Sequence, residues 1–454
     1  MAQPPPALTV EQLRTQVRDG AVDTVVVAFP DMQGRLQGKR IHAQFFLDTV
    51  LEHGTEGCNY LLAVDVDMNT VDGYAISSWE RGYGDFEFVL DLDTLHPVPW
   101  IPGTAMVLCD LAWLDDVHTA VAESPRQILR AQAERAAAQG LLAFAGTELE
   151  FIVFNDTYEQ AWSAGYRDLT PANQYNVDYS LLGTSRVEPL LRDIRNGMFT
   201  AGLVVESAKG ECNLGQHEIA FKYDEVVRTA DNHSIYKNGA KEIASQHGKA
   251  LTFMAKFDQR EGNSCHIHMS LRGDDGRIVF DEGDGPTPMF RSFVAGIQAT
   301  MCELTLLYAP NINSYKRFQA GSFAPTSTAW GYDNRTCSLR VVGHGAGLRL
   351  ENRLPGGDVN PYLALAGMLA SGLRGIDQEL QLEPAYEGNA YLSDHPKVPT
   401  SLRSARDLFA GSSVAREMLG AAVVDHYVNN ADVELAAFEA AVTDWERYRS
   451  FERM

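Results

Sequence analysis

The segment GTELEFIVF, Gly146–Phe154, places two carboxylates inside a run of residues that is otherwise typical of a buried strand. Apolar and β-branched residues from Leu149 onward predict that this strand lies in the interior of the protein. Because side chains alternate between the two faces of a strand, Glu148 and Glu150 should point toward the same space. Neighbouring carboxylates repel each other, and burying either one alone costs several kcal/mol. A chain that buries this strand therefore needs a partner for both acids.

The bulk composition is that of an ordinary globular protein, with 454 residues, 45% hydrophobic and 22% charged. This length is sufficient for two domains of unequal size. The net charge is −22, from 38 Lys and Arg against 60 Asp and Glu, which argues against nucleic acid or an anionic membrane as the partner. Clusters of acids can also hold divalent cations, although surface solubility alone would account for most of the excess.

The acidic net charge fits a cytoplasmic enzyme, and the cysteine usage is typical of a cytosolic protein. No cysteine pair has C-x-x-C spacing, so we expect reduced core thiols. The first residues, MAQPPPALTV, are Pro-rich without a basic or apolar leader region, which predicts no signal peptide. No apolar run reaches the length of a transmembrane helix. The six cysteines are Cys58, Cys109, Cys212, Cys265, Cys302 and Cys337.

Residues 1–112 predict a small, strand-rich domain. A short helix should end at Gly20, and a strand–turn–strand unit with its turn at Met32–Gly34 should follow. Further strands are expected at NYLLAV, FEFVLDL and TAMVLCDL. The segment Met68–Asp85 contains three Gly and no clear period, which predicts a functional loop.

Residues 113–454 predict a larger α+β domain. Its first helix, Ser124–Gly140, begins with Ser-Pro and ends on Gly. Strands are expected at LTFMAKF and HIHMSL. Further helices are expected over Glu188–Asn196, Asp224–Lys249, Phe290–Tyr308, Pro361–Gly372, Ser401–Ala410 and Asp432–Phe451.

More charged residues lie in apolar, strand-like surroundings. Taken singly, each has an ordinary explanation as a solvated face, a salt bridge or a structural ion triad. Together, five acids and one His beside five Arg suit Mg²⁺ or Mn²⁺ rather than a tetrahedral zinc site. Metals among carboxylates with convergent Arg are typical of phosphoryl transfer from ATP, although neither a G-x-x-x-x-G-K-S/T loop nor a kinase Gly-rich loop is present. The five acids are Glu148, Glu150, Glu211, Glu218 and Glu351, and the five arginines are Arg317, Arg335, Arg340, Arg349 and Arg353. The imidazole comes from the strand face that carries His266, His268 and Ser270.

These motifs resemble those of the glutamine synthetase family, in the family's order and over nearly the whole chain. GTELEF is similar to the family's G-P-E-P-E-F strand, GNSCHIHMSL to G-S-G-M-H-x-H-x-S-L, and RLENRLPGGDVNPYL to R-x-E-x-R-x-P-D-x-x-N-P-Y-L. ECNLGQHE, NSYKR and NRTCSLR also have counterparts in the family. The resemblance implies an N-terminal β-grasp domain and a catalytic domain with an antiparallel sheet surrounded by helices. It also implies a cytoplasmic dodecamer of two hexameric rings with active sites between subunits.

The resemblance further implies two to three Mg²⁺ or Mn²⁺ ions per site, with ATP as co-substrate. The metal nearer glutamate would be held by Glu150, Glu211 and Glu218. The metal on the ATP phosphates would be held by Glu148, His266 and Glu351. All six ligands are present, which argues against a non-catalytic, structural or regulatory relative. Nucleotide contacts would come from Tyr223, His268, Ser270, Arg335, Arg340 and Arg349.

Glutamate would be bound by Gly262 and by the guanidinium forks of Arg317 and Arg353. Arg335 would also stabilise the phosphoryl group in transfer. The segment VDGYAISSW partly resembles the family's D-G-S-S-I-x-G-W, so Asp72 aligns with the acid that deprotonates the incoming nitrogen in a neighbouring subunit's site. The catalytic candidates are therefore Asp72, Arg317 and Arg335.

Two departures from the family pattern concern the amine substrate. Phe323 stands where ammonia-using members have a Glu that binds ammonium, and an apolar ring can neither hold ammonium by charge nor accept its proton. The ring could line an alkylamine pocket, including by cation–π contact, or it could only pack the loop. Glu261 replaces a family Asn and could attract a cationic amine or face solvent.

These departures resemble the γ-glutamyl-amine ligase branch of the family. The expected activity is ATP-dependent joining of the γ-carboxylate of L-glutamate to an organic amine through γ-glutamyl phosphate. The amine would be a polyamine or a small monoamine such as ethanolamine, and the sequence does not choose between them. The alternative is a true glutamine synthetase that uses ammonium.

Overall fold

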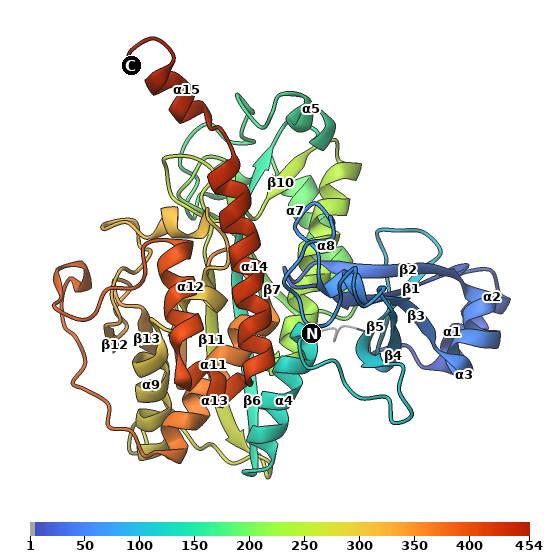
Figure 1. The fold of residues 1–454 in the computed structure, drawn as a ribbon, viewed down its shortest axis with the longest axis horizontal. Helices are drawn as coiled ribbons and strands as arrows, with labels where there is room; N and C mark the ends of the chain where they lie inside the picture. Colours follow the sequence, from blue (N-terminus) through green and yellow to red (C-terminus); the bar gives the residue numbers. More distant parts are fainter. Residues whose placement is uncertain (1–4) are drawn as a thin grey trace.

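The computed structural model describes residues 5–454 and has the α+β architecture that the sequence predicts (Figure 1). The first part of the chain forms a five-stranded sheet of order β2-β1-β5-β4-β3. Strands β1 and β5 are parallel, and the other pairs are antiparallel. The strands are β1 (Thr24–Pro30), β2 (Leu36–His42), β3 (Thr55–Cys58), β4 (Asp85–Pro97) and β5 (Thr104–Trp113). The helices are α1 (Val10–Arg18), α2 (Ala43–Phe45) and α3 (Leu51–His53), with a π-helical segment, Phe46–Val50, between the last two.

The expected strand at NYLLAV is wrong, because Asn59–Leu62 forms a 3₁₀ turn. The Asn59 side chain is buried, accepts a hydrogen bond of 2.6 Å from the Ser77 hydroxyl and donates to the Ile76 carbonyl. These contacts with a distant loop fix Asn59 in a conformation that a strand would not allow. Residues 68–84, up to the start of β4, contain no helix or strand, and Ile76 and Ser77 of this segment contact the turn.

The second sheet runs in the order β12-β13-β14-β11-β6-β8-β7, and β9 and β10 also pair with β6. It is antiparallel except for the parallel pair β12–β13. The longest strand, β6, is the one that carries GTELEFIVF. The strands are β6 (Leu141–Phe154), β7 (Val205–Gly210), β8 (Gln216–Phe221), β9 (Asp224–Glu225), β10 (Ala250–Thr252), β11 (Cys265–Gly273), β12 (Trp330–Tyr332), β13 (Leu339–Val342) and β14 (Arg349–Asn352).

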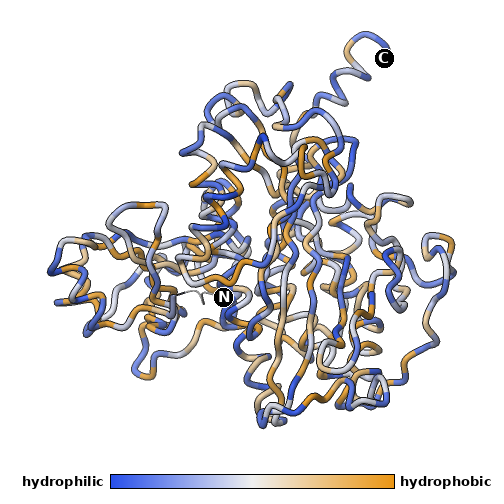
Figure 2. Tube along the Cα trace, turned by 180° about the vertical axis from the view of Figure 1, so that it is seen from behind, coloured by the Kyte–Doolittle hydropathy of each residue, from blue (hydrophilic) through white to orange (hydrophobic). Residues whose placement is uncertain are grey.

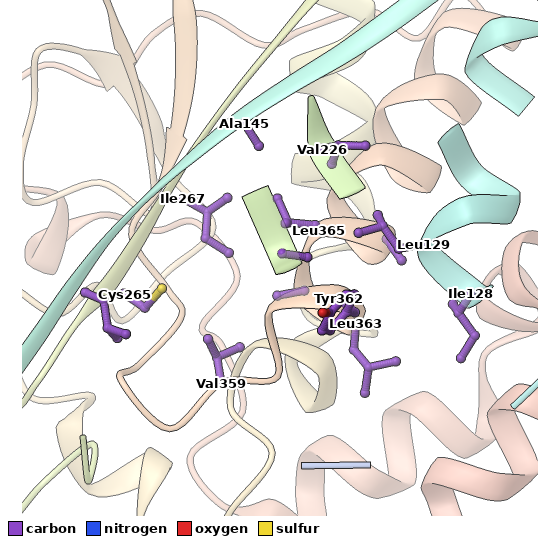
Figure 3. Packing of buried hydrophobic residues seen from close by; sticks show 14 of the residues in the cluster. Ile128, Leu129, Ala145, Val226, Cys265, Ile267, Val359, Tyr362, Leu363 and Leu365 are labelled. Carbon is purple, nitrogen blue, oxygen red and sulfur yellow. The ribbon is translucent and has the colours of Figure 1, made fainter. Parts of the chain in front are cut away.

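Helices cover the apolar face of this sheet. Helices α4 and α8 pack against β6, and α11 packs against α4, α8 and α9. Figure 3 shows Ala145 of β6 and Ile267 of β11 facing Leu365 of α11 and Val226 of α8. The helices are α4 (Pro125–Ala137), α5 (Tyr158–Ser163), α6 (Leu181–Thr184), α7 (Glu188–Thr200), α8 (Val226–Gln246), α9 (Pro288–Thr300), α10 (Thr305–Tyr308), α11 (Pro361–Asp377), α12 (Leu402–Gly411), α13 (Ser413–Leu419), α14 (Ala421–Ala440) and α15 (Asp444–Ser450).

Three expected elements are shorter or divided. LTFMAKF leaves the sheet after Thr252, because the Asn263 amide donates to the carbonyls of Thr252 and Met254 in place of a strand partner. The helix expected over 290–308 is divided into α9 and α10, with a turn at 301–304. The helix expected over 432–451 ends at Ala440, and α15 begins after a new capping box at Thr443.

Arg126 of α4 joins the two parts of the molecule. Its guanidinium donates to Asp110 of β5 at 2.8 Å and to Asp91 of β4 at 2.6 Å, and it pairs with Asp231 of α8 through two hydrogen bonds of 2.9 and 3.0 Å. The Tyr362 hydroxyl donates to the same Asp231. This buried network holds the N-terminal sheet against the helices that support the second sheet.

The chain ends in α15, which stands away from the rest of the molecule in both views (Figure 1, Figure 2). All six cysteines are free. Among the helices of residues 5–454, none combines the length and apolarity needed to cross a membrane.

Candidate active site

The charged residues form a row of cross-strand neighbours on the face of the second sheet opposite the helices. Glu150 of β6 lies directly across from Glu218 of β8, and Glu148 lies across from His266 of β11. On the other side of β11, His268 lies across from Glu351 of β14. The period-two alternation along each strand puts all these side chains on one face, while Leu149 and Ile267 point into the core.

The first carboxylate group consists of Glu150, Glu211 and Glu218, and one ligand oxygen from each lies within 4.8 Å of the others. This is the set that the sequence predicted for the metal nearer glutamate. Burial raises the pKa of Glu218 to about 8, and the neighbouring carboxylates add to the rise against the opposing effect of Lys209. Lys209 forms an ion pair with Glu211, and its Nζ lies 3.8 Å from Glu218.

The second group contains Glu148, Glu351 and two imidazoles. His268 Nε2 lies 3.0 Å from Glu148, and His266 Nδ1 lies 3.3 Å from Glu148 and 3.7 Å from Glu351. Ligand atoms of Glu148, His268 and Glu351 lie within 4.8 Å of one another, so the structure puts either His beside the two acids. Burial would raise the pKa of Glu148, but hydrogen bonds from His266 and His268 outweigh it and lower this pKa.

The hydrogen bonds of both imidazoles determine their tautomers. His266 is buried, which lowers its pKa and favours the neutral ring. Its Nδ1 faces a carboxylate that only accepts, so Nδ1 carries the proton and the buried Nε2, which has no partner, keeps a free lone pair. Arg349 Nε donates to His268 Nδ1 at 3.2 Å, so the proton of His268 is on Nε2 and points at Glu148.

Three arginines lie close to the acids. Arg353 donates to Glu351 Oε1 at 2.5 Å, and Arg340 donates to Glu351 Oε2 at 2.8 Å. Together with the histidines they lower the pKa of Glu351, although burial alone would raise it. Arg335 is exposed at the rim of the same cavity.

Two cavities lie along this row and share Glu148. The first, of about 260 Å³, is lined by all six predicted metal ligands and by most of the residues predicted for glutamate and the amine. The second, of about 300 Å³, contains most of the residues predicted for the nucleotide. Predicted residues in the first cavity are Glu148, Glu150, Glu211, Glu218, Glu261, Gly262, His266, Phe323, Arg335, Arg340, Glu351 and Arg353. Those in the second are Glu148, Tyr223, His268, Ser270 and Arg349.

Two predicted residues do not line either cavity. Arg317 is buried, and its two terminal nitrogens donate to the carbonyls of Leu354 and Arg353 at 2.8 and 2.9 Å. Asp72 is exposed, and its carbonyl accepts a hydrogen bond from Asn429 of α14. The structure brings neither side chain to the cavities of its own chain, so the roles of both remain predictions.

Phe323 forms part of the wall of the first cavity and is 58% exposed. Its φ is +58°, a left-handed conformation that is uncommon for a bulky residue. The loop is held by the Ser322 hydroxyl, which donates to the Gln319 carbonyl, and by the Tyr391 hydroxyl, which donates to the Ala324 carbonyl. The backbone therefore directs the ring toward the cavity at a cost in local strain.

Several lining residues were not predicted from the sequence. Lys209 lies two residues before Glu211, and Arg272 lies two residues after Ser270, so strand alternation could have placed both beside the site. Arg272 stacks on Phe144 and Tyr223, with centroid distances of 5.2 and 5.7 Å. Loop residues without any regular pattern complete the first cavity, namely Asp178, Tyr179, Cys212, Ser264 and Ser322.

The donor set suits a hard divalent cation. The first group offers only carboxylate oxygens. The Lys209 ammonium lies among them, which shows that the site accommodates positive charge. The second group adds an imidazole nitrogen beside its acids, either His266 Nδ1 or His268 Nε2. Oxygen-rich donors with one imidazole fit Mg²⁺ or Mn²⁺ better than a thiolate-rich or tetrahedral metal site.

Comparisons with known proteins assign this fold and site to a class. The glutamine synthetase catalytic domain family matches residues 122–450. A solved structure described as a GmaS/ADP complex superposes with a TM-score of 0.84 at 25% identity, over 97% of this chain and 99% of that one. The chain belongs to the glutamine synthetase family, which confirms the family and fold class expected from the sequence.

Two relatives within the family bear the names of glutamate–amine ligases. Gamma-glutamylethanolamide synthetase GlnA4 of Streptomyces coelicolor is 66% identical over 449 residues, which cover 99% of this chain and 97% of that protein. Glutamate–isopropylamine ligase of a Pseudomonas species is 36% identical over 446 residues, which cover 96% and 97%. The chain thus resembles members that are named for organic amines.

Proposed function

We propose that this protein is an ATP-dependent ligase that joins the γ-carboxylate of L-glutamate to a small organic amine, with ethanolamine as the preferred acceptor. The observation that carries the proposal is the position of Phe323 in the cavity wall, where ammonia-using members of the family have a Glu. The names of the two amine-ligase relatives support the same choice, and that of the more similar one supports ethanolamine.

The chemistry begins with activation of a poor acyl donor. A carboxylate does not lose its oxide, whereas phosphorylation by ATP gives γ-glutamyl phosphate, from which phosphate departs when the amine attacks. In this proposal Arg335 at the rim stabilises the transferring phosphoryl group, and Arg353 and Gly262 bind the glutamate substrate. Arg340, Arg349, His268, Ser270 and Tyr223 contact the nucleotide. Arg317 would support glutamate binding indirectly, because its hydrogen bonds hold the backbone of Arg353 and Leu354 in place.

Glu150, Glu211 and Glu218 would hold one divalent cation, and Glu148, His266 and Glu351 would hold another. Bound Mg²⁺ or Mn²⁺, two to three ions per site, would neutralise charge on the phosphates and orient them. The acids of the site are themselves held in position. Gln216 and the Ser264 amide donate to Glu150, and Arg340 and Arg353 donate to Glu351.

The amine side of the cavity combines negative charge with an apolar ring. Glu261 lines the same cavity as Phe323, so an alkylammonium could meet both a carboxylate and a π-face there. The attacking nitrogen must be neutral, and Asp72 of a neighbouring subunit is the proposed base. Asp72 is exposed and does not line either cavity of its own chain, which is consistent with that assignment.

We further propose a cytoplasmic dodecamer of two hexameric rings, with one domain over residues 1–112 and the catalytic domain over residues 113–454. The division is supported by the separate five-stranded sheet, whose last strand ends at Trp113. Six free cysteines suit a reducing compartment.

The decisive experiment measures phosphate release with L-glutamate, ATP and Mg²⁺ against a panel of acceptors. The panel contains ethanolamine, isopropylamine, putrescine, spermidine, spermine and ammonium at matched concentrations. The highest kcat/KM is expected for ethanolamine. Robust turnover with ammonium alone would overturn the amine-ligase proposal in favour of a true glutamine synthetase.

A further inference from the structure

Lys209 extends into the carboxylate group of Glu150, Glu211 and Glu218 rather than into solvent. It lies on β7 directly across from Glu218 of β8. Its ammonium forms an ion pair with Glu211, lies 3.8 Å from Glu218 and lies 5.0 Å from the centre of the Tyr179 ring. Only 27% of its side chain is exposed. Contacts from strand β8 and from two loop residues therefore hold one positive charge inside the cavity.

This position gives the ammonium a definite effect on the site. Glu150 and Glu218 oppose each other across β6 and β8, and like charges directly opposite each other are destabilising. The ammonium offsets that repulsion as long as it remains among the acids. A divalent cation on the same carboxylates would meet positive charge at contact distance, so the ammonium must withdraw as the cation binds.

We infer that Lys209 is an internal counter-ion that competes with the divalent cation for the glutamate-side carboxylates and weakens the affinity of that site. The inference rests on the proposed function, because that function makes Glu150, Glu211 and Glu218 metal ligands. A purely structural ion pair would behave differently, since its loss would destabilise the protein without strengthening cation binding. If Lys209 competes with the cation, removing its charge should destabilise the metal-free protein and should strengthen cation binding.

The test replaces the charge while keeping most of the side chain. Lys209→Met should lower the Kd for Mn²⁺ at one class of site by about tenfold, and by at least about fivefold, as measured by calorimetric titration. Lys209→Arg keeps the charge and should stay within about twofold of the wild type. A matched control is Lys249→Met, because Lys249 donates to Asn155 far from the cavities.

Thermal unfolding provides a second measurement. Metal-free Lys209→Met should unfold at a lower temperature than the metal-free wild type, and Mn²⁺ should raise its unfolding temperature by a larger increment. In a Glu211→Gln background, the gain in Mn²⁺ affinity should disappear, which assigns the effect to this group.

The outcomes separate this inference from the proposed function. Saturable Mn²⁺ binding that Glu218→Gln abolishes, but that Lys209→Met leaves unchanged or weaker, overturns the counter-ion role alone. A complete lack of saturable Mn²⁺ binding in the wild type and in all variants overturns the counter-ion role and the proposed function together.

Discussion

Replacing Phe323 with glutamate changes the wall of the first cavity without changing the residues proposed to bind metal. The variant side chain starts from the same backbone, and Glu tolerates the φ of +58° no better than Phe does. Because the Phe323 side chain is 58% exposed, little core packing is lost, and the fold should remain stable. The expected effect therefore concerns the choice of acceptor.

The magnitude follows from two contributions. A carboxylate about 4 Å from an ammonium contributes about 4 kcal/mol at an effective dielectric constant of about 20. Solvent screening at a residue that is 58% exposed reduces this to about 1–2 kcal/mol, and the attraction acts on ammonium and on ethanolammonium alike. Loss of the half-buried ring removes about 1 kcal/mol of apolar contact from an alkylamine. Because the charge term largely cancels between the two cations, the differential effect is about 1 kcal/mol, or a shift of about fivefold in favour of ammonium.

The assay is phosphate release at saturating L-glutamate and ATP, with ammonium or ethanolamine varied. The measured quantity is the ratio of kcat/KM for ammonium to kcat/KM for ethanolamine, in the wild type and in Phe323→Glu. Phe323→Leu is the control, since it keeps an apolar wall, and it should change the ratio by less than about threefold. If Phe323→Glu also changes the ratio by less than about threefold, the ring only packs the loop and the reasoning about the amine wall is wrong.

Two further predictions test the acids and the buried histidines. Glu148→Gln should lower kcat for phosphate release by about 10²–10³-fold, because the residue faces both cavities and accepts hydrogen bonds from His266 and His268; an effect below about tenfold would contradict its proposed role. Burial lowers the pKa of His426 from 6.5 to about 3, so its contribution to stability is complete above pH 6.5 and is lost as the pH falls toward 3. In urea unfolding between pH 4 and 6, His426→Phe should therefore lose less stability than the wild type, by about 1.4 kcal/mol per pH unit; parallel pH profiles would show that the imidazole is not the titrating group.

Strand alternation predicted the most important part of the site. The carboxylates of β6 and the His-x-His of β11 point to one face because their neighbours are apolar, and that requirement is local. The register that places Glu150 against Glu218 joins strands that are far apart in the sequence, so local pattern could not supply it. Resemblance to a family supplied those partners, and the two groups of acids in the structure follow them closely.

The missed features depend on contacts that have no local pattern. The turn at Asn59 follows from a hydrogen bond to Ser77, although its neighbours have high strand propensity. Asp178 and Tyr179 reach the first cavity from an irregular loop, whose course is set by the rest of the fold. The orientation of Arg317 toward backbone carbonyls could not be foreseen either, because the motif identifies the arginine but not the groups that its side chain contacts.

The two halves of the first cavity are built from different kinds of backbone structure. The half proposed for phosphoryl transfer is built from paired strands, where a change at one residue disturbs a partner on the next strand. The half proposed for the amine is built from loops that carry Tyr179, Glu261 and Phe323, and these residues are not paired in the sheet. Acceptor preference can therefore diverge through single substitutions in loops while the activation of glutamate stays intact. A family with this architecture can change its amine substrate during evolution while it keeps the residues that activate glutamate.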